Sequence, residues 1–334
     1  MSVGDGPLEL TAEERDEFAE AIDGLPAFDI RRLDETVADE LTDWSELVPS
    51  RVADGVLDLR AGAVPSCRIV VRNLPVDPEL PPTPQDGGPS PTKSTRVSEY
   101  TLLLLASIAG EVVGYEEEKD GLLVHDVSPK PGSEERQENT GSVFFDLHTE
   151  NAFHPLTPDL LSLVCLRPDH DREARTLVAS ARDIADALPR SDVEVLRAPL
   201  FQTRMPTSFL TEPDAEEVLS DPQPVLTGRR DDPRICVDSF NTVPTTAEAE
   251  RSLRELVLVL KSKLDGPALE PGDLLMVDNR RAVHARTAFR PRYDGEDRWL
   301  QRVYAVCEPR KVEWIHSSGT HVCGGLPVLE TVGS

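Results

Sequence analysis

The chain lacks the features that mark membrane-spanning, secreted and nucleic-acid-binding proteins. No stretch approaches the roughly 18 consecutive apolar residues of a membrane helix, and no basic region followed by an apolar one begins the chain, so neither a membrane span nor a secretory signal is expected. Lys and Arg number 35 against 61 Asp and Glu, for a formal net charge of −26. Because phosphate backbones are bound by clustered positive charge, no nucleic-acid partner is expected.

Cysteines are few, odd in number and widely spaced. The five are Cys67, Cys165, Cys236, Cys307 and Cys323, and no two of them form a Cys-x-x-Cys pair. Several lie inside apolar runs, where a thiol behaves as a small core residue. This pattern favours a reduced, cytoplasmic protein over a disulfide-bonded secreted one.

Helices are expected in only a few places. The candidates are residues 11–23 with a capping box of Thr11 and Glu14, residues 98–116 with Ser98 as N-cap, and the amphipathic residues 247–264. Residues 74–92 contain seven prolines and two glycines, which predicts an extended connector between these elements.

Short β-type runs make up much of the remaining sequence. They cover residues 67–74, 121–127, 142–148, 160–166, 174–179, 234–238, 273–278 and 301–307. The runs do not alternate regularly with helices, so a doubly wound α/β sheet is disfavoured. A mainly β fold with flanking helices, with a β-sandwich or jelly-roll core (a double-stranded β-helix), is expected instead.

Two segments carry candidate metal ligands. His148 and Glu150 follow a β-type run in FDLHTENAFH, and alternate residues of a strand point to the same side, so both can face one metal. His284 follows an apolar strand and a polar turn in VDNRRAVH. Two histidines and one carboxylate on one side of a metal leave three coordination positions open, which is the arrangement of non-haem Fe(II) oxygenases. A structural zinc site would require a fourth ligand, which this pattern does not offer.

An arginine at a suitable distance suggests which cosubstrate occupies the open positions. Arg298 lies fourteen residues after His284 (298 − 284). An enzyme that uses 2-oxoglutarate must hold the distal carboxylate of this molecule, and the arginine fork is a bidentate partner for a carboxylate. Arg302 lies four residues later, on the same side of a strand.

Three segments resemble the clavaminate synthase-like group of Fe(II)/2-oxoglutarate oxygenases. They are HTENAFHPLTPDLLSLVCLR, DNRRAVHARTAFRPRYDGEDRWLQR and LPVDPELPPTP, and the resemblance extends from about residue 67 to about residue 308. It includes features of the group's asparagine oxygenase and of the arginine and lysine hydroxylases of peptide-antibiotic pathways. It implies a jelly-roll oxygenase domain with lid insertions over residues 61–334. Residues 1–60 are expected to form a helical segment packed on that core, within one structural domain overall.

The resemblance also implies roles for individual residues. It implies that His148, Glu150 and His284 bind iron. It also implies that Arg298, assisted by Thr176, binds the distal carboxylate of 2-oxoglutarate. Arg302 is implied to bind the α-carboxylate of an amino-acid substrate. The other implied substrate contacts are Glu118 for the amino group, and Asn139, Ser208, Asp238 and Phe240.

Two of the implied positions limit the chemistry and the substrate. Halogenases of the group have a small residue in place of the carboxylate ligand, so the presence of Glu150 disfavours halogenation. Pro206 and Phe240 stand where the arginine enzymes have aspartates, which weakens a full guanidinium clamp.

The expected function is therefore hydroxylation, at C3 by resemblance, of a free L-amino acid of asparagine, glutamine, lysine, ornithine or arginine type. Iron(II), 2-oxoglutarate and O₂ are the expected cofactor and cosubstrates, and specialised peptide or antibiotic biosynthesis is the expected setting. A carrier-tethered substrate, desaturation and cyclisation stay open, as does the oligomeric state. An intact ligand set disfavours a catalytically silent jelly-roll binding protein. No catalytic role is expected for the other histidines, which are His125, His154, His170, His316 and His321.

Overall fold

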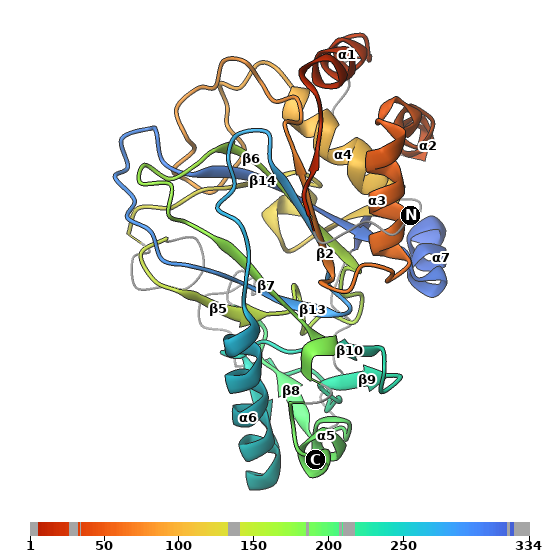
Figure 1. The fold of residues 1–334 in the computed structure, drawn as a ribbon, viewed down its shortest axis with the longest axis vertical. Coiled ribbons are helices and arrows are strands. Elements are labelled where there is room, and N and C mark those ends of the chain that lie inside the picture. The colour runs from red at the N-terminus through yellow and green to blue at the C-terminus, as the bar shows by residue number, and fades with distance from the viewer. Residues whose placement is uncertain are drawn as a thin grey trace.

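A large sheet and a small sheet face each other and form the centre of the molecule (Figure 1). The computed structural model describes residues 6–26, 33, 35–132, 141–184, 187–206, 209, 218–318 and 321–323. The large sheet has the strand order β1-β2-β12-β6-β14-β3-β15, and β4 also pairs with β14. The small sheet has the order β5-β13-β7 and is antiparallel throughout.

The strands are short and most of them are antiparallel. The large sheet contains β1 (Leu8–Glu9), β2 (Arg68–Arg72), β3 (Glu111–Tyr115), β4 (His125–Val127), β6 (Leu160–Arg167), β12 (Leu274–Asp278), β14 (Trp299–Val306) and β15 (Val322–Cys323). The small sheet contains β5 (Phe145–His148), β7 (Thr176–Ser180) and β13 (Ala282–Arg286). Two further antiparallel pairs are β8 (Phe201–Thr203) with β11 (Thr242–Pro244), and β9 (Leu226–Gly228) with β10 (Pro233–Ile235).

Helices cover the outer faces of both sheets (Figure 1). The α-helices are α1 (Ala12–Asp23), α2 (Glu35–Trp44), α3 (Ser50–Arg60), α4 (Val97–Ala109), α5 (Arg190–Leu196), α6 (Ala247–Lys263) and α7 (Pro309–Ser318). Single 3-10 turns are η1 (Ser45–Leu47), η2 (Lys119–Gly121) and η3 (Ala181–Ile184). The predicted capping box is confirmed at α1, where Thr11 and Glu14 bond reciprocally.

Strand β6 illustrates why the centre of the large sheet is apolar on both faces. Side chains of a strand alternate between its two faces. Val164 and Leu166 belong to the cluster under helices α1 to α4, whereas Leu161 and Leu163 belong to the cluster between the two sheets. A strand that is covered on both sides requires a continuous apolar run.

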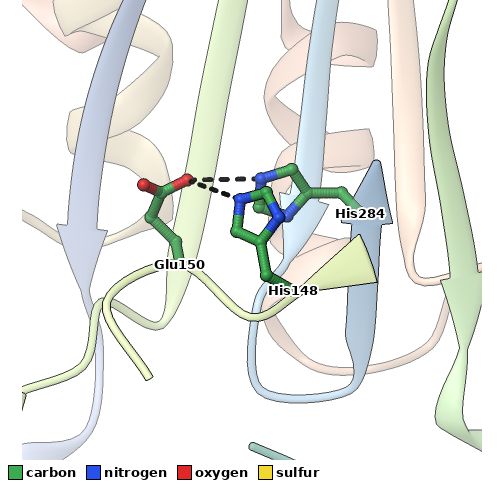
Figure 2. A group of neighbouring side chains, drawn as sticks. All are labelled: His148, Glu150 and His284. Atoms are coloured by element: carbon green, nitrogen blue, oxygen red, sulfur yellow. Dashed lines mark ion pairs between the residues drawn. The ribbon is translucent and has the colours of Figure 1, made fainter. Parts of the chain in front are cut away.

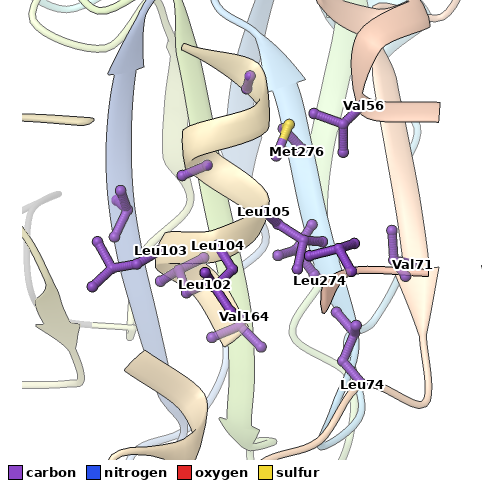
Figure 3. Packing of buried hydrophobic residues seen from close by; sticks show 14 of the residues in the cluster. Val56, Val71, Leu74, Leu102, Leu103, Leu104, Leu105, Val164, Leu274 and Met276 are labelled. Atoms are coloured by element: carbon purple, nitrogen blue, oxygen red, sulfur yellow. The ribbon is translucent and has the colours of Figure 1, made fainter. Parts of the chain in front are cut away.

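Helix α4 lies across the outer face of the large sheet. Figure 3 shows Leu102 and Leu104 packed beside Val164 and Leu274 of the sheet, with Val56 of α3 nearby. Helix α6 covers the outer face of the small sheet in the same way, through an apolar stripe that includes Leu253, Leu256 and Leu260. The prediction of a mainly β core with flanking helices is therefore confirmed.

The predicted helix over residues 98–116 is wrong at both ends. The helix ends at Ala109, and Glu111–Tyr115 form strand β3, whose β-branched residues pair with β14. Ser98 lies inside the first turn and does not cap it. The cap is supplied by Asp77 of the connector, which accepts the backbone N–H groups of Val97 and Ser98, each at 3.2 Å. A cap that is distant in sequence cannot be identified from the local pattern.

The predicted connector over residues 74–92 has no helix or strand, as expected. Lys93, a buried lysine directly after the connector, anchors the end of the connector to the core through ion pairs. Lys93 lies 2.8 Å from the carboxylate of Asp77 and 2.5 Å from that of Glu99, and all three side chains are almost inaccessible to water. Buried charges are tolerated when they are paired in this way. Among the described residues, no helix has the length and apolarity needed to cross a membrane.

Burial of histidines predicts a loss of stability in mild acid. Burial lowers the pKa of His154 to about 4 from an ordinary value of 6.5. Between pH 6.5 and 4 the unfolded chain therefore binds a proton that the folded chain does not, so the free energy of unfolding falls as the pH falls through this window. We expect this one residue to account for a decrease on the order of 1 kcal/mol or more.

Urea unfolding of the wild type and of His154→Gln at pH 7 and pH 4.5 measures this effect. The variant should lose less stability than the wild type between the two pH values. His316→Gln is the control, because its side chain is 60% exposed. An equal pH dependence for the wild type and His154→Gln would contradict the assignment.

Candidate iron and 2-oxoglutarate site

The pairing of two strands brings the two predicted histidine ligands together. His148 at the end of β5 stands directly opposite His284 on β13. Residues opposite each other in an antiparallel pair project to the same face, and the neighbours of His284, Val283 and Ala285, face the outer cluster under α6. Both imidazoles therefore lie between the two sheets, with ring centroids 4.2 Å apart.

Glu150 completes the group from the loop after β5. Figure 2 shows its carboxylate directed at both rings. Its Oε2 atom lies 3.2 Å from Nε2 of His284 and 3.9 Å from Nε2 of His148. The three side chains are buried, and their ligand atoms all lie within 4.8 Å of one another.

The donor set fits a divalent iron ion with open coordination positions. Nδ1 of His148 lies 2.9 Å from the carbonyl oxygen of Asp146, so Nδ1 carries the proton and Nε2 offers its lone pair to a metal. Burial and the neighbouring His148 lower the pKa of His284 to about 4, so the His284 ring is neutral near pH 7. The cluster contains no fourth histidine, cysteine or carboxylate from the described part of the chain, which leaves room for exogenous ligands.

Glu150 is ionised in spite of its burial. Burial by itself raises the pKa of this carboxyl, but the charge of Arg302, with smaller contributions from the two histidines, more than offsets the effect, and the pKa lies below its ordinary value. Arg302 Nη1 donates to Glu150 Oε1 at 3.0 Å, and the hydroxyl of Tyr304 donates to the same oxygen at 2.9 Å. With Oε1 held in this way, Oε2 remains directed at the histidines.

Asn279 fixes the backbone of the carboxylate ligand. Its side-chain oxygen accepts the backbone N–H of Glu150 at 2.9 Å, and its amide group donates to the carbonyl oxygens of Glu150 and Pro158 at 3.2 and 2.8 Å. No role was expected for Asn279 or Tyr304 from the sequence. The only sequence signal for Tyr304 is its place two residues after Arg302 on the same strand.

The predicted cosubstrate residues also come together. Arg298 is 6% exposed, and its Nη2 donates to the hydroxyl of Thr176 at 3.2 Å. Among the described residues, none pairs with Arg298 through a carboxylate within 4.0 Å. Gly266 allows its loop to lie against β7 at this point, because a Cβ at this position would meet the carbonyl oxygen of Thr176 at 1.9 Å. A buried guanidinium without an acidic partner is suited to a carboxylate ligand.

A second arginine, missed in the sequence, lies beside Arg298. Arg286 projects from β13 two residues after His284, and the rings of Phe145 and Phe289 lie 5.9 and 5.3 Å from its guanidinium. Burial and the charge of Arg298 lower its pKa to about 9. The region beside the iron ligands is therefore positively charged.

On the other side of the iron ligands, Arg302 is paired with Glu118. Arg302 Nη2 donates to Glu118 Oε1, and the Tyr304 hydroxyl lies 3.2 Å from the same oxygen. Asn151, which directly follows Glu150 and has a left-handed φ of 49°, places its amide nitrogen 3.5 Å from Glu118 Oε2. The predicted pair of Arg302 and Glu118 is thus assembled, and Asn151 is an additional polar group that the sequence analysis missed.

Two of the predicted side-chain contacts, Asp238 and Phe240, lie on one turn. Asp238 forms an isolated bridge with His148, so both side chains lie on one face. Its carboxylate accepts the backbone N–H groups of Phe240 and Asn241, both at 2.9 Å. The Phe240 side chain is 65% exposed at this turn. Asn139 and Ser208 lie outside the described residues.

Comparison with known proteins agrees with this arrangement. Residues 88–304 match the family described as taurine catabolism dioxygenase TauD, TfdA family. The chain is 40% identical over 280 residues to the L-asparagine oxygenase of Streptomyces coelicolor, covering 84% of this chain and 83% of that protein. It is 34% identical over 274 residues to the L-lysine 3-hydroxylase of Catenulispora acidiphila, covering 81% and 76%.

The fold is similar to a solved enzyme–product complex. The structure of asparagine oxygenase with Fe(II), 2S,3S-3-hydroxyasparagine and succinate superimposes with a TM-score of 0.87 at 35% identity, covering 96% of this chain and 99% of that one.

Removal of one histidine should remove the metal. We expect His148→Ala to weaken Fe(II) binding by at least about 100-fold, because two remaining ligands hold a divalent ion poorly. Anaerobic Fe(II) titration and metal analysis of the purified variant measure the loss. His316→Ala is the matched control, since it removes an exposed histidine. Wild-type iron affinity in His148→Ala would disprove the ligand assignment.

Proposed function

The chain belongs to the taurine catabolism dioxygenase TauD, TfdA family, and we propose that within this family it hydroxylates C3 of a free L-amino acid with a polar or basic side chain. It is a non-haem iron(II) dioxygenase that uses 2-oxoglutarate and O₂. Bound iron with O₂ and 2-oxoglutarate supplies the chemistry that replaces C–H by C–OH, while 2-oxoglutarate becomes succinate and CO₂. His148, Glu150 and His284 hold the iron, and Arg298 with Thr176 holds the distal carboxylate of 2-oxoglutarate.

The ion pair of Arg302 and Glu118 beside the iron ligands is the observation that carries this proposal. An amino-acid zwitterion presents a carboxylate and an ammonium group, and these are the partners that a guanidinium and a carboxylate prefer. The Nε atom of Arg302 is buried and has no hydrogen-bond partner. The substrate carboxylate binds the side of the Arg302 guanidinium that carries Nε, and the substrate ammonium group binds Glu118.

Replacement of the contact between Arg302 and Glu118 by these two substrate contacts requires both charged ends of the amino acid. A substrate tethered through a thioester has lost its carboxylate and would leave Arg302 without a new partner, so the site favours a free amino acid. With the backbone end held by two groups beside the iron, the side-chain carbon nearest the metal is the one oxidised.

Asp238 limits the kind of side chain that the site accepts. A carboxylate has about four lone-pair positions. Oδ1 receives two backbone N–H groups, and Oδ2 receives the side-chain amide of Asn241 at 2.8 Å. One position on Oδ2 remains. A single donor such as a carboxamide or an ammonium group fits that position, whereas the two parallel N–H groups of a guanidinium require both oxygens.

The cellular setting follows from the thiols and the substrate class. All five cysteines are free, which supports the reducing cytoplasm. Free hydroxylated amino acids are building blocks for modified peptides, and we place the enzyme in specialised peptide or antibiotic biosynthesis.

A substrate screen tests the proposed function directly. Twenty amino acids and ornithine are incubated with the Fe(II)-loaded enzyme and 2-oxoglutarate, and substrate-dependent succinate and a product heavier by one oxygen are measured by mass spectrometry. We expect turnover with a substrate of the asparagine, glutamine, lysine or ornithine type. The methyl ester and the N-acetyl derivative of that substrate should each lose at least about 100-fold in kcat/KM, because each removes one charged partner.

Failure of every free amino acid would refute the proposal. Equal turnover of the methyl ester would refute the role of the carboxylate and favour a tethered substrate. A product lighter by two hydrogens would indicate desaturation or cyclisation.

A conservative change at Asp238 tests recognition of the side chain. Asp238→Asn keeps an oxygen for the N–H groups of the turn but removes the negative charge. We expect the KM of the preferred amino acid to rise on the order of 10-fold or more, with iron and 2-oxoglutarate affinity unchanged. Asp238→Ala should in addition lower the melting temperature, since the turn loses its acceptor. An unaltered KM and substrate preference in Asp238→Asn would remove this residue from the recognition site.

A further inference from the structure

His125 is a buried histidine that the proposed reaction does not use. It lies on β4, directly opposite Arg302 of β14, and its side chain is 1% exposed. Its ring stands edge-on to the ring of Tyr304, with centroids 5.5 Å apart. The side chain therefore faces the guanidinium from the strand next to it.

The hydrogen bonds of His125 determine its tautomer. Nε2 lies 2.7 Å from the carbonyl oxygen of Leu122, and Nδ1 lies 2.9 Å from Nη2 of Arg302. A carbonyl oxygen can only accept, so Nε2 carries the proton. A guanidinium can only donate, so Nδ1 must offer a lone pair. Burial lowers the pKa of His125 to about 4, so the neutral form predominates near pH 7.

Arg302 has its donors distributed among three acceptors. One Nη2 hydrogen goes to Glu118 and the other to His125, whereas Nη1 donates to Glu150. Nε has no partner. In a guanidinium, Nε and Nη2 share one edge, and that edge is the one that binds a carboxylate side-on. The Nη2 hydrogen that bonds Glu118 becomes available once the substrate ammonium group binds Glu118.

We propose that His125 is a positioning residue that holds Arg302 with its Nε–Nη2 edge toward the substrate carboxylate. This inference rests on the proposed function, because it assigns His125 a role through the substrate-binding arginine. Without an acceptor at this position, the guanidinium would turn toward Glu150 and Glu118, the two remaining acceptors, and would present a different edge to the substrate. His125 thus acts on substrate affinity and leaves the 2-oxoglutarate site unaffected.

Two substitutions separate this role from a general contribution to folding. His125→Phe keeps the aromatic contact with Tyr304 but removes the acceptor for Arg302. His125→Asn places a side-chain oxygen near the position of Nδ1, and like His125→Phe it gives up the bond to Leu122. The difference between the two variants therefore reports the acceptor for Arg302. His125→Leu replaces His125→Phe if the larger ring prevents folding.

The control removes a different buried histidine from the same sheet. His321 is 5% exposed and bonds a backbone carbonyl, that of Val112, at 2.8 Å through Nδ1. His321→Leu should reproduce any unspecific loss of stability and leave substrate affinity unchanged.

The measurements are steady-state KM and kcat with the amino acid identified by the screen, KM for 2-oxoglutarate, and calorimetric binding of that amino acid to protein loaded with Fe(II) and 2-oxoglutarate without O₂. We expect His125→Phe to raise the amino-acid KM and dissociation constant by about 10- to 100-fold, a range typical of lost supporting contacts. The kcat at saturation and the KM for 2-oxoglutarate should change little. His125→Asn should recover most of the affinity.

Arg302→Met separates failure of this inference from failure of the proposed function. If Arg302→Met leaves amino-acid affinity intact, the role assigned to Arg302 is wrong. If Arg302→Met abolishes affinity while His125→Phe binds as tightly as the wild type, only the positioning role is wrong. Equal losses in His125→Phe and His125→Asn would also overturn it, because the acceptor would then make no difference.

Discussion

A carboxylate buried between two apolar sheets must be compensated by positive charge, and Glu150 is such a carboxylate. Burial by itself would raise its pKa and favour the neutral acid, which is a poor metal ligand. Arg302 supplies the compensating charge. The iron site therefore depends on a residue that is not itself an iron ligand.

The same arginine connects the metal site to the proposed substrate site. Its guanidinium contacts Glu150 on the iron side, and Glu118 and His125 on the other side. A residue shared in this way cannot be removed without affecting both functions. This explains why so many polar groups surround one side chain in an otherwise apolar interior. The Tyr304 hydroxyl is one of them, since it donates to Glu150 and lies 3.2 Å from Glu118.

The order of residues along β14 matches the two ligand-binding roles proposed for its arginines. Arg298 stands immediately before the strand, and Arg302 and Tyr304 lie on it. Four residues of a strand span roughly 13 Å, so one strand reaches both the side proposed for 2-oxoglutarate and the side proposed for the substrate. The distance between the two arginines along the strand thus matches the distance between the two proposed ligand positions.

Local sequence was sufficient for some of these features. The pair of His148 and Glu150 was predictable as a motif at a strand end, although Glu150 lies in the loop after β5 and not on the strand. The capping box at Thr11 was predictable because it involves neighbouring residues. The helix expected to continue to residue 116 ended at Ala109, since an apolar run suits a buried strand as well as a buried helix. Strand β13, which carries His284, was not among the predicted strands.

The sequence by itself was enough to predict the set of metal ligands and an arginine suited to 2-oxoglutarate, because residue type and short spacing indicate that chemistry. Only the tertiary structure decided which distant groups support them. Asn279 bonds the backbone of Glu150, which lies 129 residues away in the sequence, and His125 bonds Arg302, which lies 177 residues away. Such contacts depend on which strands become neighbours and in what register. Pairing of strands is settled by burial of the whole core, so no local pattern reveals it.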